Sequence, residues 1–405
     1  MESKKILVVS TSFPQKPGDP LSPFIWEFCR CLSGFGWKVT ALVPHHPGLQ
    51  DHEDWEGVGV CRFRYLPERF ENLGYTGGIL PNVKRKPWRV FNLPFYVYAM
   101  YRETLRIVEK EGIDIVNFHW LYPASFWLGR FVRGSGIPVV MTGHGTDVHL
   151  AARGIFKFIA NKAFRRTSAL TVNSEYMRTV LQGNELPPRV EVIPMGVDAD
   201  KFSPEGHRPS NSKTALYVGR LIKQKGIDVL FQAFIDVVRE IPEARLDIIG
   251  YGPERENIRK LVIAHRLEKS VSIIDMVPHD RLPGIYRRAR VLLLPSLIPE
   301  GLGMTPAEAG LCGVPTITFG LGGTKEIVLD EETGLIVKPS KEALTRAMIR
   351  VLTDDALADS LGANSRRFLT GKIGWQGVAE QFNKLFMDIS KGARNSDLAS
   401  ETGAI

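Results

Sequence analysis

Short apolar runs rich in β-branched residues alternate along this chain with longer stretches in which apolar residues recur every three or four positions. Runs of the first kind predict buried strands, and stretches of the second kind predict amphipathic helices. Such an alternation is typical of a parallel sheet with helices on both faces. In the first half of the chain we expect strands at Ile6–Val9, Lys38–Val43, Ile113–Phe118 and Pro138–Thr142, and helices around Phe24–Phe35, Tyr101–Glu111 and Ser125–Gly134.

The alternation starts again after residue 205, beyond the polar linker Asp198–Lys213. The predicted fold class is therefore α/β, with two Rossmann-like, doubly wound parallel-sheet domains facing each other across a cleft that holds the site. In this second half we expect strands at Ala215–Val218, Arg245–Ile249, Val271–Ile274 and Val291–Pro295, and helices at Gly226–Glu240, Glu254–His265, Asp280–Ala289 and from Thr305 onward.

These patterns predict an N-terminal domain over residues 1–200 and a C-terminal domain over residues 201–374. Residues 45–95 interrupt the alternation with Gly, Pro, Arg and aromatic residues, which indicates an elaborated surface region. The last helix, at 375–391, is expected to return to the N-terminal domain. Residues 392–405 are rich in Ser, Ala, Gly and Asn and predict a disordered tail.

Composition and charge exclude several classes of protein. No apolar run reaches the roughly 20 residues that cross a bilayer, and the N-terminal run is too short for a signal peptide, so we expect a soluble, cytoplasmic protein. The four cysteines are too few and too scattered for a disulfide scaffold, and their spacing does not predict a metal site. The net charge of +8 fits any anionic partner, whether a phosphate-bearing ligand, a membrane surface or a polynucleotide. Since so modest an excess does not specify nucleic acid, we expect no nucleic-acid partner.

The segment Val218–Gly226 predicts a phosphate site, because it lies between a strand and a helix and carries Arg220 and Lys225. A helix N-terminus offers free N–H groups and a partial positive charge, both of which suit phosphate. Arg220 can bind an oxyanion with two parallel hydrogen bonds, and Lys225 adds a point charge. The alternative is a solvated loop with ordinary surface cations.

A second strand-to-helix turn follows Pro295, with Gly301 and Gly303 permitting a ligand to approach the backbone. Thr305 is expected to cap the helix, with the proline after it in the first helical position. The backbone N–H groups of Met304 and Thr305 would then point at a ligand.

Two carboxylates flank this turn. Glu300 lies on the loop beside the positive helix end, and Glu308 lies about one turn into the helix, where it can accept hydrogen bonds from two ribose hydroxyls. Two carboxylates eight positions apart are common by chance, so the surrounding order of strand, glycine-rich turn and helix carries the interpretation.

The Glu300–Glu308 segment resembles the signature of retaining glycosyltransferases of the two-domain GT-B fold, family 4 (glycosyl transferases group 1). The resemblance covers nearly the whole chain except residues 45–95 and the tail. Leu302 and Gly310 depart from the family pattern and change packing only, and Met195 replaces a usual Asn. Further segments that resemble family elements are Gly143–Asp147, Val192–Asp198, Val218–Gly226, Ile249–Pro253 and Thr333–Leu335.

The resemblance implies that the enzyme moves a hexose from a nucleotide-diphosphate sugar (UDP- or GDP-hexose) to a saccharide or lipid-linked acceptor, in the synthesis of cell-surface polysaccharide or glycolipid. Arg220 and Lys225 would hold the diphosphate, Glu308 the ribose and Glu300 the hexose. The other donor-binding positions that it implies are Gly18, Gly250, Gly252, Val277, Gly303, Met304 and Thr305.

On the N-terminal domain, the resemblance implies that His144 contacts the donor sugar. A lone loop histidine is more often structural, and only its setting between two glycines after a strand favours catalysis. Asp147 and His119 are predicted on the acceptor side, although His119 and the Trp after it could equally be packed loop residues. No metal or cofactor is expected, because the cations can stabilise the leaving phosphate. The one Asp-x-Asp triplet of the sequence, Asp198-Ala199-Asp200, lies in the predicted linker. Front-face attack with retention is implied by the family alone.

Residues 151–167 contain five cations and no acid, with Phe156, Phe158, Ile159 and Phe164 interleaved. A basic aromatic face of this kind can lie on anionic lipid, which would place the protein peripherally on the inner face of the membrane and favour a lipid-linked acceptor. The alternative is a solvated helix face over a core stripe.

Other functions remain open on the sequence. A sugar-nucleotide epimerase or a sugar-phosphate-forming enzyme can share this fold, and a non-catalytic nucleotide-sugar-binding subunit would be expected to lack Glu300, Lys225 or Arg220. A dinucleotide dehydrogenase is disfavoured, because the first strand–helix turn has no Gly-x-Gly-x-x-Gly.

Overall fold

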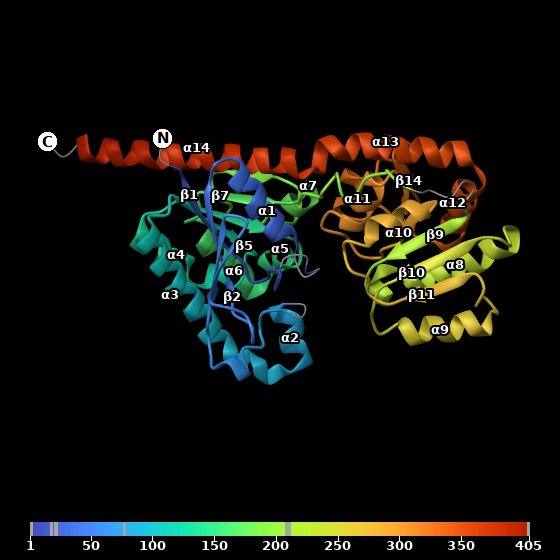
Figure 1. Cartoon of the computed structure of the whole chain (residues 1–405), viewed down its shortest axis with the longest axis horizontal. Coiled ribbons are helices and arrows are strands. Elements are labelled where there is room, and N and C mark those ends of the chain that lie inside the picture. The colour runs from blue at the N-terminus through green and yellow to red at the C-terminus, as the bar shows by residue number, and fades with distance from the viewer. Residues whose placement is uncertain (1–2, 17–18, 20–22, 76–77, 207–211, 403–405) are drawn as a thin grey trace. The chain divides into compact units, whose positions relative to one another are not determined.

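The computed structural model describes residues 3–16, 19, 23–75, 78–206 and 212–402, with the backbone alone described over 392–402. The chain divides into two compact units (Figure 1). The first unit comprises Met1–Gly196 and Trp375–Ile405, and the second comprises Val197–Gly374. Each has the doubly wound α/β architecture that the sequence predicts.

The first unit is built on an eight-stranded sheet in the order β3-β4-β2-β1-β5-β6-β7-β8. Neighbouring strands are parallel except β3 and β4, which are antiparallel. The strands are β1 (Lys5–Val9), β2 (Lys38–Pro44), β3 (His52–Trp55), β4 (Val58–Phe63), β5 (Ile115–His119), β6 (Val139–Gly143), β7 (Ala169–Val172) and β8 (Val190–Val192).

Helices cover both faces of this sheet. On one face, α3, α4 and α6 bury Tyr96, Phe131 and Phe164 in a common core. On the other, α1 packs on α14, with the rings of Phe28 and Phe382 4.9 Å apart. The helices are α1 (Pro23–Gly34), α2 (Ile79–Arg85), α3 (Leu93–Glu111), α4 (Leu128–Ser135), α5 (Thr146–Ala151), α6 (Gly154–Phe164), α7 (Glu175–Val180) and α14 (Trp375–Thr402), with 3-10 turns η1 (Glu68–Phe70), η2 (Pro87–Asn92) and η3 (Ala124–Phe126).

The region 45–95, predicted as surface elaboration alone, contributes two strands to the sheet. The β3–β4 hairpin turns at Glu56 and Gly57, whose φ values of 51° and 84° suit a two-residue hairpin turn. The strand β4 then pairs with β2 and extends the sheet. The polar sequence of β3 gives it little strand signal, which explains why the sequence pattern missed it.

The second unit has a six-stranded sheet in the order β11-β10-β9-β12-β13-β14, and all its neighbouring strands are parallel. One face packs on α8 and α12, and the other packs on α10, α11 and α13. The elements are β9 (Thr214–Val218), η4 (Lys223–Lys225), α8 (Ile227–Glu240), β10 (Arg245–Ile249), α9 (Arg255–Ala264), β11 (Val271–Ile274), α10 (Leu282–Arg288), β12 (Val291–Leu294), α11 (Met304–Leu311), β13 (Thr316–Thr318), η5 (Gly323–Glu326), β14 (Gly334–Ile336), α12 (Lys341–Thr353) and α13 (Asp355–Ile373).

The C-terminal prediction needs correction. The helix α14 runs from Trp375 to Thr402, so residues 392–402 are helical rather than disordered, and residues 403–405 lie outside the described part of the chain. This segment contains Ala, Leu and Glu and no proline, so an established helix can propagate through it. No helix among the described residues is long and apolar enough to cross a membrane.

Candidate functional site

The loop after β9 carries the predicted phosphate-binding cations. Its course is fixed by the Tyr217 hydroxyl, which donates a hydrogen bond to the backbone oxygen of Arg220 at 2.8 Å. At its end, Gly226 adopts φ 70° and is the N-cap of α8, and a Cβ there would lie 1.8 Å from the oxygen of Pro295. Only glycine therefore lets this loop pack against the end of β12.

Gly250 and Gly252, predicted near the base, also have a structural reason to be glycine. Their φ values are 148° and 157°, and a Cβ at each would lie 1.9 Å and 2.2 Å from the backbone oxygens of Gly219 and Leu221. The backbone N–H of Leu221 donates to Tyr251 at 2.8 Å. The turn after β10 thus holds the loop after β9 in place.

The loop before α11 fixes Glu300 through its backbone. The Glu300 N–H donates to Leu321 at 3.1 Å, and the N–H of Gly323 donates to the oxygen of Glu300 at 2.9 Å. A Cβ at Gly322 would lie 2.4 Å from that oxygen, so this contact also requires a glycine. The side chain of Glu300 therefore extends from a rigid backbone.

The start of α11 differs from the prediction. Gly303 is the N-cap, with φ 99° and no side-chain cap, and the helix begins at Met304. Thr305 and Pro306 are therefore inside the first turn rather than at the cap and first position. Since Gly303 tolerates the left-handed backbone that this cap adopts, it replaces the threonine as the start signal.

Lys225 and Glu300, predicted on different parts of the donor, form an ion pair. The Lys225 Nζ lies 2.5 Å and 2.7 Å from the two carboxylate oxygens, with both side chains about 15% exposed. They line a pocket of about 170 Å³ at the carboxyl ends of β9 and β12. The other predicted residues that line it are Arg220, Gly303, Met304 and Thr305.

Glu308 is buried and does not line this pocket. Its Oε2 accepts a hydrogen bond from the Tyr286 hydroxyl at 2.7 Å, and its Oε1 lies 2.9 Å from Nε2 of His279. Val277, two residues before this histidine, packs on the core beneath. The sequence reading missed both partners of Glu308, because neither belongs to the motif that contains it.

In the first unit, His119 and His144 come together at the carboxyl ends of β5 and β6. The His119 Nδ1 lies 3.0 Å from the His144 Nε2, and the ring of Trp120 lies 4.5 Å from that of His144. Burial lowers the pKa of His144 to about 4, and it holds the pKa of His119 well below its ordinary value. Both imidazoles are therefore neutral at pH 7.

Two features mark the surroundings of this pair as a strained polar site. Trp120 has a positive φ of 74°, which is costly for a bulky residue and typical of ligand-binding positions. Among the described residues, His119 Nε2, Trp120 Nε1 and Asn173 Oδ1 are buried without a hydrogen-bond partner. Unpaired polar atoms of this kind suit a ligand rich in hydroxyl groups.

Asp147, predicted on the acceptor side, holds the loop around it through backbone hydrogen bonds. Its carboxylate accepts backbone N–H groups from Leu121 at 2.9 Å, His144 at 3.0 Å and Gly145 at 2.9 Å. Its side chain is buried, and its place on the acceptor side stays a prediction. Gly18, predicted near the diphosphate, lies outside the described residues.

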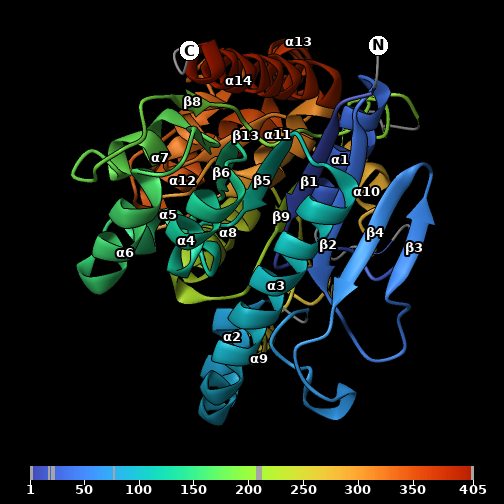
Figure 2. The ribbon, with the colours of Figure 1, turned by 90° about the vertical axis from the view of Figure 1, so that its left-hand side faces the viewer.

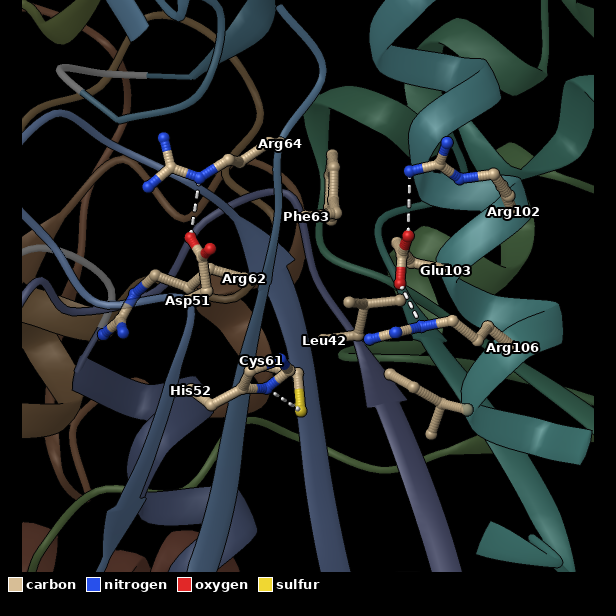
Figure 3. Close-up of a pocket in the computed structure, with 11 residues that line it drawn as sticks. Leu42, Asp51, His52, Cys61, Arg62, Phe63, Arg64, Arg102, Glu103 and Arg106 are labelled. Carbon is tan, nitrogen blue, oxygen red and sulfur yellow. Dashed lines mark hydrogen bonds and ion pairs between the residues drawn. The ribbon is translucent and has the colours of Figure 1, made fainter. Parts of the chain in front are cut away.

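A larger groove of about 280 Å³ lies between the end of β4 and α3 (Figure 3). Its charged side chains pair with one another: Arg64 Nε lies 2.8 Å from Asp51, and Glu103 pairs with Arg102 at 3.0 Å and with Arg106 at 2.7 Å. Within the described residues, no cluster of three or more metal-ligating side chains is found. Among the described residues that line this groove there is no glycine, whereas Gly219 and Gly303 line the pocket of the second unit.

Comparison with known protein families gives two matches. The model described as "Glycosyltransferase Family 4" matches residues 22–201, and the model described as "Glycosyl transferases group 1" matches residues 198–368. Together they span both units and include Arg220, Lys225, Glu300 and Glu308 in one match and His119 and His144 in the other.

Similar curated proteins include a GDP-mannose-dependent alpha-(1-6)-phosphatidylinositol monomannoside mannosyltransferase from Mycolicibacterium smegmatis, 27% identical with 98% of each chain covered. A glycogen synthase from Mycobacterium tuberculosis is 29% identical, covering 73% of this chain and 75% of the relative.

Among solved structures, sucrose-phosphate synthase from Thermosynechococcus elongatus has a TM-score of 0.75 at 22% identity, covering 96% of this chain and all of the other. Anabaena HepE in complex with UDP-glucose has a TM-score of 0.69 at 16% identity, covering 95% and 99%. These likenesses show the two-domain GT-B fold.

Proposed function

The chain belongs to the glycosyltransferases of family 4 (glycosyl transferases group 1), and from that membership we propose that it is a retaining hexosyltransferase with a UDP- or GDP-hexose donor. The observation that carries the proposal is the pocket of the second unit. There, Arg220, the Lys225–Glu300 pair and the first N–H groups of α11 converge on a space of about 170 Å³. A diphosphate needs such a set of cations and oriented N–H groups.

The chemistry follows from where charge develops. The bond between the anomeric carbon and the phosphate oxygen breaks, and the sugar becomes positive while the phosphate becomes negative. Arg220, Lys225 and the helix end stabilise the departing phosphate, and the Glu300 carboxylate lies beside the positive sugar. The acceptor hydroxyl forms the new bond on the same face, and its proton passes to the departing phosphate oxygen. The cations supply the charge stabilisation that a divalent metal would otherwise give, so we propose metal-independent transfer.

We assign the histidine pair of the first unit to sugar binding. His144 is neutral at pH 7, because burial lowers its pKa to about 4, so it acts there as a hydrogen-bonding group and not as an acid. The buried atoms of Trp120 and Asn173 that lack protein partners suit hydroxyl groups of the same ligand.

The acceptor that we propose is lipid-linked. The mycobacterial relatives that match along more than nine-tenths of this chain carry names that specify GDP-mannose and a phosphatidylinositol mannoside. We propose a donor of the same kind. An acceptor presented at a membrane surface also agrees with a basic and apolar face of the first unit.

That face is defined by two acid-free stretches, 72–102 and 148–174, each of which carries five Lys or Arg residues. The 3-10 turn η3 contacts both α3 and α6, and Figure 2 shows α3, α4 and α6 next to one another. Every exposed large hydrophobic residue in the described part of the first unit lies in or beside these stretches: Phe70, Leu80, Trp88, Val90, Phe91, Phe95, Tyr98, Phe126, Ile155 and Phe158.

Basic and apolar side chains on one face favour docking to an anionic bilayer, with aromatic rings at the headgroup level. Sedimentation with phosphatidylglycerol-containing vesicles at low salt is expected to bring the protein down, whereas neutral phosphatidylcholine vesicles leave it in solution. Replacing Phe91 and Phe95, 75% and 56% exposed, with Ser is expected to weaken the binding. The control is Ile263→Ser on α9, which is 64% exposed. Equal sedimentation with both lipids would contradict the proposed binding to anionic membranes.

The test of the main proposal is a donor screen with UDP- and GDP-hexoses and a lipid extract as acceptor. We expect release of UDP or GDP together with a product whose anomeric configuration, read by NMR, matches the donor. An epimerase would change the sugar without releasing the nucleotide, and a non-catalytic subunit would bind a donor without either change. Either result, or the absence of any reaction, contradicts the proposal.

A further inference from the structure

The Glu308 carboxylate is held by two donors of the protein itself. The Tyr286 hydroxyl donates to one oxygen at 2.7 Å, and Nε2 of His279 lies 2.9 Å from the other. Because a carboxylate oxygen only accepts, His279 carries its hydrogen on Nε2. Burial, with the nearby carboxylate second, raises the pKa of Tyr286 well above its ordinary value, so this hydroxyl stays protonated and remains a donor.

Both donors are themselves fixed by packing. The ring of Phe202 lies 5.1 Å from His279 and 6.1 Å from Tyr286, and Phe202 and Tyr286 are fully buried. The tyrosine is on α10, which packs directly against α11 and its glutamate. The terminal torsion of a glutamate is soft, so its carboxylate plane is set by these partners rather than by its own rotamer.

Two acceptor positions remain on the carboxylate. Each oxygen has about two lone-pair directions, and one on each is taken by a protein donor. One unused acceptor position therefore remains on each of the two carboxylate oxygens. Two such positions side by side match two hydroxyl groups on neighbouring carbons. A ribose offers such a pair at its 2′ and 3′ positions.

We propose that His279 and Tyr286 are positioning residues that orient Glu308 to accept hydrogen bonds from both hydroxyls of the donor's ribose. The inference rests on the proposed function, since it requires a ribonucleotide in the second unit. His279 follows Val277, in the turn expected at the base, by only two residues, and its side chain is 29% exposed. His279 therefore connects the turn that contains Val277, expected at the base, to the Glu308 carboxylate, expected at the ribose.

The experiment compares UDP and GDP with their 2′-deoxy counterparts by titration calorimetry. With the wild type, we expect the better-binding ribonucleotide to bind about tenfold more tightly than its deoxy form, since a hydrogen bond to a charged group is lost. In Tyr286→Phe and His279→Leu this ratio of ribonucleotide to deoxynucleotide affinity is expected to fall to roughly two or three. The affinity for the deoxy nucleotide is expected to fall less than that for the ribonucleotide, because it has only its 3′-hydroxyl to lose from Glu308. His279→Gln keeps an N–H donor and is expected to restore most of the ratio.

The controls separate this inference from the proposed function. His265→Leu removes an exposed histidine at the end of α9 and is expected to leave both affinities unchanged. Glu308→Gln is expected to reduce the ratio at least as much as Tyr286→Phe. If Glu308→Gln lowers the ratio and the Tyr286 and His279 variants do not, the positioning role is wrong while the proposed function stands. If the wild type binds no nucleotide, the proposed function fails and the inference fails with it.

Discussion

In the second unit the polar groups of the pocket are charged, partly exposed and carried on glycine-fixed loops. In the first unit the two paired histidines are neutral, buried or half-buried, and carried at strand ends. Lys225 and Glu300 form an ion pair beside a helix end. His119 and His144 form a hydrogen-bonded pair of uncharged rings. The first arrangement suits a diphosphate, and the second suits a sugar, which has hydroxyl groups and no charge. Under the proposed function, one chain thus separates charge stabilisation from sugar recognition between two similar folds.

The largest expected effect is loss of the charged pair. Lys225→Ala should lower kcat by about a thousandfold, because a preorganised charge that stabilises the leaving group is lost. Steady-state kinetics measure the effect, and circular dichroism checks that the variant is folded. The matched control is Lys223→Ala, an exposed cation in the same η4 turn, for which we expect no more than about a twofold change. If the two variants had similar kinetics, the special role of Lys225 in the pocket of the second unit would be wrong.

A smaller effect is expected at the neutral pair. His144→Ala should lower kcat/KM by roughly 10- to 100-fold, the range for a hydrogen bond whose loss leaves a polar partner buried. The wild-type rate should show no inflection from His144 between pH 5.5 and about 8, because its pKa is about 4. His149→Ala, a partly exposed histidine of α5, serves as the control. An inflection near pH 6.5 that disappears in His144→Ala would mean that this ring is not neutral in the working enzyme.

The same burial predicts how the stability of the first unit depends on pH. Between pH 6.5 and pH 4 the unfolded state binds a proton at His144 that the folded state does not, so stability falls as the pH is lowered through this window. The loss is about 3 kcal/mol for His144, and His119 adds to it in the same direction.

Intrinsic fluorescence can follow this loss selectively, because all seven Trp residues belong to the first unit. Urea unfolding at pH 7 and pH 4.5 should show a smaller acid-induced loss for His144→Gln than for the wild type. An equal loss in both proteins would show that the buried pair does not govern the acid response.

The glycines that shape the charged site give a separate prediction, on stability. Gly250→Ala should destabilise the second unit by roughly 3 kcal/mol, since its Cβ would lie 1.9 Å from the oxygen of Gly219 at a φ of 148°. Gly371→Ala on α13 has no atom within 4 Å of its Cβ and should stabilise by about 0.5–1 kcal/mol. Thermal unfolding followed by circular dichroism compares the two. Equal melting temperatures would mean that the loops of the charged site are not fixed in this way.

The charged site was largely predictable from sequence because its parts are contiguous. Arg220 and Lys225 lie five positions apart, and Glu300, Gly303 and Thr305 lie on one turn, so a local pattern brings them together. The structure adds contacts between residues that are far apart in the sequence. The pairing of Lys225 with Glu300 joins two loops 75 positions apart.

The sequence interpretation failed where a role depends on packing between distant segments. His279 and Tyr286 reach Glu308 from another loop and helix, and nothing in their own sequence indicates a shared carboxylate. The bonds of Asp147 were hidden for the same reason, since the three backbone N–H groups that donate to it include one from a separate loop. The polar strand β3 gave no periodic signal, and pairing with β4 alone makes it a strand.

The central claim is that the pocket of the second unit binds the diphosphate of a nucleotide sugar without a metal. Titration calorimetry of the wild type and of Arg220→Ala with UDP and GDP, in buffer containing EDTA, tests it most directly. The account predicts that the wild type binds at least one nucleotide and that Arg220→Ala weakens the binding by about 10- to 100-fold, the loss of one charged hydrogen-bonding group. Binding that requires added divalent metal, or that is unchanged in Arg220→Ala, would contradict it.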